Sequence, residues 1–132
     1  HVFKMLSIHY LNIAVIKIAI LVLAFKPGTD DMRESPAIPI INYLLTKKSL
    51  ITAFDPVAQE EAKKIFETDK IVYSKSIDGV VKGVDVIILL TRWPEFEVIP
   101  HVLNTSKNIP LLIDGRRMLD KNCVPRYEGI GL

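Results

Sequence analysis

The chain has 132 residues, of which 49% are hydrophobic and 24% charged, as expected of one ordinary globular domain. The formal net charge of +2 comes with basic residues in isolated pairs rather than in a stripe, which argues against nucleic-acid binding. Cys123 is the single cysteine, so an intrachain disulfide is excluded, and the apolar run 18–25 falls short of the about 20 residues that a membrane span needs.

Residues 1–14 differ in pattern from the rest of the chain. Val2, Met5, Leu6, His9 and Tyr10 recur there at helical spacing. We interpret this stretch as the remnant of a helix or linker that belongs to a preceding domain. Because the chain also starts without an initiator Met, we expect a piece of a longer protein, with one domain over 15–132.

The first strand is predicted over 17–25, a short run rich in Ile, Val and Leu. Such runs are typical of strands that are buried on both faces of a parallel sheet. Pro27 and Gly28 end the strand, and a polar loop then leads to a helix start. Ser35 can cap the first free N–H groups there, and Pro36 fits the first helical position.

The rest of the chain continues to alternate strands with helices. Helical or strand periodicity, acidic and basic helix ends, and glycine or proline breakers place the later elements. The predicted helices are 35–47, 59–66, a one- or two-turn helix within 76–83 that Gly83 ends, and 95–103. The predicted strands are 50–54, a short edge strand at 71–73, 84–91, 110–113 and a final short one at 126–130.

This alternation implies right-handed crossovers. We therefore predict an α/β domain with a doubly wound, mainly parallel sheet and helices on both faces. The arrangement is Rossmann-like, but the glycine fingerprint G-x-G-x-x-G is missing after the first strand, so this is not expected to be a main dinucleotide site. Asp55, at the end of the second strand, is accordingly predicted to cap the helix that follows Pro56.

Charged side chains gather in the loop after the first strand, which carries Lys26, Asp30, Asp31 and Arg33. Ligands of open α/β sheets bind at the carboxyl ends of strands. Lys26, Arg33 and the N–H groups of the helix start could hold a polyphosphate there. A solvated turn, in which the two aspartates pair with the two cations, fits the residues equally well.

A second charged segment, Asp114-Gly-Arg-Arg117, follows another predicted strand and should lie at the same edge of the sheet. The planar fork of Arg116 or Arg117 could clamp a phosphate or a sugar hydroxyl. Alternatively, both arginines are solvated or pair with Asp120. The three histidines lack ligand spacing, so no metal site is predicted.

The segment AFKPGTDDMRESPA (24–37) resembles the signature that opens the C-terminal domain of UDP-glucose 6-dehydrogenases. GDP-mannose and UDP-N-acetylmannosamine dehydrogenases have close relatives of it. Further matches follow in order at FDP (54–56), KGVDVIILLTRWPEF (82–96) and DGRR (114–117). Four ordered motifs, spread over roughly 16–131, are far more specific than one short pattern. Val22 departs from the family, which usually has Gly at that position.

The resemblance implies a nucleotide-sugar-binding domain. By it, Phe25, Lys26 and Arg116 contact a UDP-sugar, and Arg33 reaches NAD that is bound mainly by a domain absent from this chain. The implied reaction oxidises UDP-glucose to UDP-glucuronate in two hydride transfers, through a cysteine thioester. The nucleophilic cysteine of the family lies in a central domain, so Cys123 is not that residue and no catalytic residue is expected here.

The resemblance also implies partners. These are the N-terminal and central dehydrogenase domains of the same enzyme, and a homodimer of the full-length protein; the domain alone should be inactive. The single cysteine fits a location in the reducing cytoplasm. One alternative is the corresponding domain of a UDP-N-acetylmannosamine or GDP-mannose dehydrogenase. Another, of a different class, is a non-catalytic flavodoxin-like nucleotide-binding module.

Overall fold

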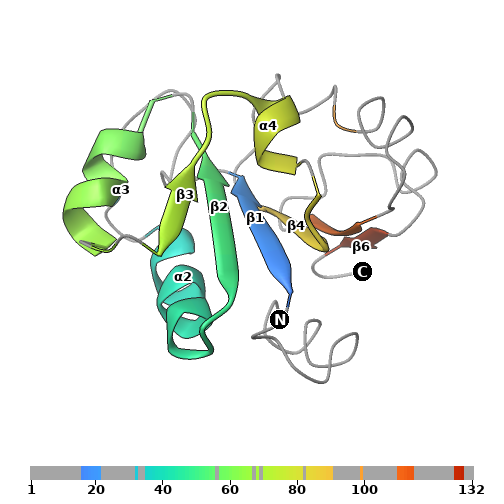
Figure 1. Ribbon diagram of the computed structural model, residues 1–132, viewed down its shortest axis with the longest axis horizontal. Coiled ribbons are helices and arrows are strands. Elements are labelled where there is room, and N and C mark those ends of the chain that lie inside the picture. The colour runs from blue at the N-terminus through green and yellow to red at the C-terminus, as the bar shows by residue number, and fades with distance from the viewer. Residues whose placement is uncertain are drawn as a thin grey trace.

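Parallel strands form the frame of the molecule (Figure 1). The computed structural model describes residues 16–21, 32, 35–55, 57–66, 68, 70–81, 83–90, 99, 110–114 and 127–129. Its strands are β1 (Lys17–Leu21), β2 (Leu50–Phe54), β3 (Ile71–Tyr73), β4 (Val86–Leu89), β5 (Leu111–Asp114) and β6 (Tyr127–Gly129). They lie in the order β3-β2-β1-β4-β5-β6, and every neighbouring pair is parallel.

The order of the strands reverses next to β1. The chain moves outward from β1 through β2 to β3, then crosses back so that β4 pairs with the other side of β1. Ile20 thus has Ala53 of β2 as one register partner and Ile88 of β4 as the other. Such a reversal is where ligands bind in doubly wound folds.

Helices cover both faces of the sheet, which confirms the predicted fold class. α2 (Ala37–Thr46) and α3 (Gln59–Phe66) pack on one face, and α4 (Ile77–Val81) packs on the other. Acidic residues occupy the first turn of α3 and basic residues its last turn, an arrangement that the helix dipole favours. Figure 1 shows α3 beside the edge strand β3 and α4 near the carboxyl ends of β1 and β2.

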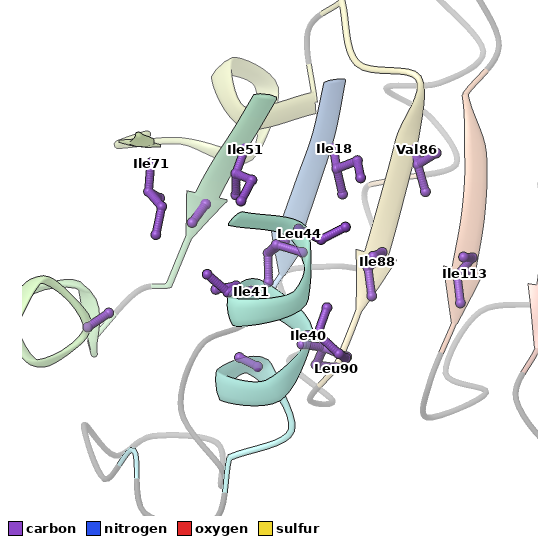
Figure 2. Packing of buried hydrophobic residues seen from close by; sticks show 14 of the residues in the cluster. Ile18, Ile40, Ile41, Leu44, Ile51, Ile71, Val86, Ile88, Leu90 and Ile113 are labelled. Atoms are coloured by element: carbon purple, nitrogen blue, oxygen red, sulfur yellow. The ribbon is translucent and has the colours of Figure 1, made fainter. Parts of the chain in front are cut away.

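Alternate residues of β1 contribute to two separate cores, because successive side chains of a strand point to opposite faces. On one face Ile18 and Ile20 pack with Ile41 and Leu44 of α2, and Figure 2 shows the α2 side chains directed at the strands. On the other face Leu21 packs with residues of α4 and β4. The strands thus lie between two apolar layers.

Three elements match their predicted limits residue for residue: β2, α3 and β3, the last of which lies at the edge of the sheet as expected. α2 begins at Ala37, two residues later than predicted, because Pro36 takes the N-cap position. β4 is shorter than the predicted 84–91. β6 lies within the predicted strand 126–130, whose first and last positions are outside the described residues.

The predicted strand 110–113 is wrong by one residue at each end, because β5 starts at Leu111 and Asp114 ends it. Asp114 pairs in register with Leu89 on one side and Gly129 on the other. The strand starts only after Pro110, which has no N–H to give to a ladder. Of the predicted helix 95–103 only Ile99 is described, and it is helical. The part of the first strand beyond Leu21 and the helical remnant 1–14 lie outside the described residues.

Candidate functional site

The carboxyl ends of β1, β4 and β5 meet at one edge of the sheet. β1 ends at Leu21 and β4 at Leu89, which are register partners, and the N–H of Leu90 donates to the Leu21 carbonyl oxygen at 2.6 Å. β5 ends beside them at Asp114. The loop of Lys26 leaves from β1 and the DGRR segment leaves from β5, so the two begin at the same edge with one strand between them.

The site residues inferred from the sequence lie outside the described residues. Phe25, Lys26 and Arg33 fall in the segment between β1 and α2, and Arg116 falls just after β5. Their roles therefore stay predictions. The structure shows only that the strands preceding these residues, β1 and β5, end at the same edge of the sheet.

The start of α2 offers no open N–H group among the described residues 35–40. Ser35 N–H donates to the Met32 carbonyl at 3.1 Å, and Ala37 N–H donates to Ser35 Oγ at the same distance. Ile38 N–H donates to the Ser35 carbonyl at 3.2 Å and Ile40 N–H to that of Pro36 at 3.5 Å. The two remaining residues are prolines, which have no N–H.

This closed helix start decides between two sources of anion-binding groups. A pyrophosphate at a helix N-terminus needs backbone N–H groups that point at it. Here Ser35 is buried and its hydroxyl already occupies the position of such a ligand. Any anion at this edge must therefore be held by cationic side chains or by loop backbone, and not by the described part of the α2 N-terminus.

Asp55 caps α3, as predicted from the sequence. One carboxylate oxygen, Oδ1, accepts hydrogen bonds from Val57 N–H at 2.8 Å and Ala58 N–H at 2.9 Å. The side chain is 3% exposed, so it is directed inward at the helix start. Because Asp55 satisfies the N–H groups of Val57 and Ala58, just before α3, it has a structural role at the start of this helix.

Asp114 is a feature that the sequence analysis missed. It is fully buried and points to the same face as its register partner Leu89, which belongs to the α4-side core. A buried carboxylate must be compensated by hydrogen bonds, and Asp114 does make interactions. The sequence did contain an indication of this burial: Asp114 directly follows the apolar residues 111–113 and lies two residues before Arg116.

Two further findings concern the described residues alone. They contain no group of three or more His, Cys, Asp or Glu side chains that could hold a metal ion. Nor does any helix among them reach the length and apolarity that crossing a bilayer requires.

Comparison with known proteins identifies the same segment. The sequence model of the UDP-glucose/GDP-mannose dehydrogenase family, UDP binding domain, matches residues 19–121. This range runs from β1 to beyond β5, and so includes the edge at which the loops of Lys26 and Arg116 begin.

Curated relatives agree with this match. A UDP-glucose 6-dehydrogenase of Rickettsia prowazekii (strain Madrid E) is 42% identical over an alignment of 120 residues that covers 86% of this chain and 27% of the relative. One from Bacillus subtilis (strain 168) is 39% identical over 114 residues, 86% of this chain and 24% of the relative. The chain thus spans about a quarter of the length of these relatives.

Solved structures show the same fold at the same relative length. A UDP-glucose dehydrogenase from the archaeon Pyrobaculum islandicum superposes with a TM-score of 0.80 and 27% identity, over 96% of this chain and 28% of that one. A UDP-D-ManNAc dehydrogenase from Pyrococcus horikoshii gives a TM-score of 0.72 and 28% identity, over 98% and 29%.

Proposed function

Because this chain belongs to the UDP-glucose/GDP-mannose dehydrogenase family and matches its UDP-binding domain, we propose that it binds the nucleotide end of UDP-glucose in an NAD-dependent UDP-glucose 6-dehydrogenase-type enzyme. The observation that carries the proposal is the family match across the carboxyl edge of the sheet. The identity of the sugar nucleotide is supported by the curated relatives at about 40% identity, which are UDP-glucose 6-dehydrogenases.

In this proposal, cationic side chains hold the diphosphate. Since no described N–H group at the start of α2 is open, charge-assisted bonds from Lys26 and Arg116 supply the donors. The two residues follow strands that flank β4 at one edge, a placement that suits a ligand lying across the strand reversal. Phe25 contributes an apolar contact to the same nucleotide.

The described residues do not fit a main NAD site. The closed start of α2 leaves no backbone cradle for a pyrophosphate, and the cap formed by Asp55 engages the carboxylate that a dinucleotide-binding unit would offer to a ribose. We therefore assign NAD to another domain of the same enzyme, with Arg33 reaching it from this one. Hydride transfer depends on that other domain, and the 132-residue chain alone should produce no NADH.

The proposal extends to the setting of the domain. An N-terminal and a central dehydrogenase domain precede it in the full-length polypeptide, which forms a homodimer in the cytoplasm. Support comes from the relatives, of whose length this chain spans 27% or 24%.

Calorimetric titration of the 132-residue protein with UDP, GDP and ADP tests the proposal. UDP should bind most tightly, and Lys26→Ala should weaken it by about 1.5–3 kcal/mol, the usual worth of one hydrogen bond to a charged group. Lys17→Ala is the matched control. It removes the same charge from the amino end of the same strand, and should leave UDP affinity unchanged.

Two results would contradict the proposal. Equal losses for Lys26→Ala and Lys17→Ala would mean that only net charge matters, and tighter binding of GDP or ADP would assign the domain to another nucleotide. NADH production by the purified chain with UDP-glucose and NAD would overturn the placement of catalysis in other domains.

A further inference from the structure

Met32 is an apolar residue that is buried although its sequence neighbours are polar. Residues 26–35 (KPGTDDMRES), here called the polar segment, contain it as their one hydrophobic side chain. Met32 is only 4% exposed and belongs to the core on the α2 face of the sheet, with Ala37 and Ile40 of the first turn of α2. The flexible methionine side chain fills apolar cores well, and its burial requires that the backbone at position 32 stays beside the core.

The backbone of Met32 is fixed as well. Its carbonyl oxygen accepts the N–H of Ser35 at 3.1 Å, and Ser35 is itself buried, with its hydroxyl accepting the N–H of Ala37 at 3.1 Å. Full burial of a methionine favours the buried state by about ten- to hundredfold over exposure to water. The polar segment is therefore attached to the core at Met32, one residue before Arg33.

We propose that Met32 is a positioning residue for nucleotide binding, because it anchors the polar segment that carries Lys26 and Arg33. This role rests on the function proposed above for those two residues. Ordering a segment on binding lowers the association constant by about five- to thirtyfold for each residue fixed. The anchor fixes one end of the polar segment before a ligand arrives, and so lowers this cost. Met32 acts through the segment and is not itself a ligand contact.

Trypsin digestion of the 132-residue chain tests the anchor without any ligand. Lys26 and Arg33 are the only basic residues within 18–46, and trypsin cleaves poorly at Lys26 because proline follows it. Cleavage between β1 and α2 therefore reports on the bond after Arg33. This bond should be cleaved at least about tenfold more slowly in the native chain than in a synthetic peptide of residues 26–40.

Three variants separate the anchor from general stability. Met32→Ala should speed cleavage after Arg33 at least about tenfold, because the buried side chain is lost. Ile40→Ala, the matched control, removes an apolar side chain of the same core, 6% exposed, and should change the rate less than about twofold. Met32→Leu keeps the volume of the side chain and should behave as wild type. Rates are compared under conditions in which urea denaturation shows every variant to be folded.

UDP affinity, measured by calorimetry, then tests the positioning role. Met32→Ala should weaken UDP binding at least about fivefold, whereas Ile40→Ala and Met32→Leu should leave it unchanged. In a Lys26→Ala background, Met32→Ala should add less than about twofold, because a residue that acts through another loses its effect when that other residue is removed. Independent losses for the two substitutions would overturn the positioning role.

Two results of the digestion would overturn the anchor: native cleavage after Arg33 as fast as in the peptide, or equal acceleration by Met32→Ala and Ile40→Ala. Wild-type UDP affinity in Met32→Ala would overturn the positioning role while leaving the proposed function intact. Failure of the unmodified chain to bind UDP would instead contradict the proposed function and the positioning role with it, and the digestion would decide on the anchor alone.

Discussion

At the scale of single residues, buried polar side chains fix the starts of the helices. Asp55 and Ser35 are both nearly inaccessible, and both accept N–H groups that a helix start leaves open. Because each side chain accepts an N–H group only two or three residues away, this role can be predicted from the sequence. It also distinguishes Ser35 and Asp55, which stabilise helix starts, from residues that are predicted to bind a ligand at the same edge.

Asp55→Ala should lower the free energy of unfolding by about 1–2 kcal/mol, because the N–H groups of Val57 and Ala58, just before α3, lose their acceptor. Asp55→Asn is the matched control, since it keeps an oxygen acceptor and should cost less. Urea denaturation measures both variants. UDP affinity should stay at its wild-type value; a loss of affinity without a loss of stability would make Asp55 a ligand contact.

Tyr73 gives the stability of the domain a dependence on alkaline pH. Burial raises the pKa of its phenol, so the folded protein retains this proton at a pH where the unfolded chain begins to lose it. The contribution of the neutral phenol is therefore complete below the unfolded pKa of about 10, and is lost as pH rises through the folded pKa.

Comparison of wild type with Tyr73→Phe isolates this effect, because Phe keeps the ring and its contact with the Lys63 ammonium, 5.3 Å from the ring centroid. Free energies of unfolding measured between pH 8 and pH 11 should fall more steeply for wild type. Parallel curves for the two proteins would show that Tyr73 does not titrate differently in the folded state.

At the scale of elements, the end of α2 shows how one residue stops a helix. Lys48 N–H donates to the Leu45 carbonyl and Ser49 N–H donates to that of Leu44, each at 3.1 Å, which is the Schellman pattern. Lys48 has a φ of 60°. This left-handed conformation is energetically unfavourable for any residue that has a Cβ atom. Glycine is the usual residue there.

Lys48→Gly should therefore raise the free energy of unfolding by about 1 kcal/mol. Lys47→Gly, the neighbouring control, should lower the free energy of unfolding. Lys47 has a right-handed backbone conformation with a φ of −88°, so glycine relieves no strain there and only increases the backbone freedom of the unfolded chain. Urea denaturation of the two variants should move the midpoint in opposite directions. A fall for Lys48→Gly would contradict the assignment.

The limits of the elements could be predicted wherever local chemistry sets them. β2 ends before Asp55, and α3 carries its charges in the order that the dipole prefers. The prediction failed at β5 because membership of a strand depends on neighbours: Asp114 joins the sheet through Leu89 and Gly129. Such pairing between distant segments leaves no mark on the local sequence.

At the scale of the whole molecule, the sequence predicted the parallel, doubly wound architecture but not the order of its strands. Periodicity tells which face of a strand is buried and says nothing about which strand lies beside it. The candidate site was predicted in the same partial way. The loops after β1 and β5 could be identified from their charges, whereas the closed start of α2 depends on the position of Ser35 Oγ.

The two-sided core predicts which apolar residues the fold depends on. Ile41→Ala, at a fully buried position of α2, should cost about 2–5 kcal/mol through lost packing and a cavity. Ile65→Ala on α3, 44% exposed, should cost under about 1 kcal/mol. Thermal and urea unfolding measure both; similar losses for the two would mean that α2 is not packed on the sheet as Figure 2 shows.

The outermost strands, β3 and β6, have three described residues each. An incoming peptide that tried to extend the sheet sideways would find few backbone groups to pair with along this described part of either edge. These short edge strands are thereby poor templates for fibrils or for strand exchange.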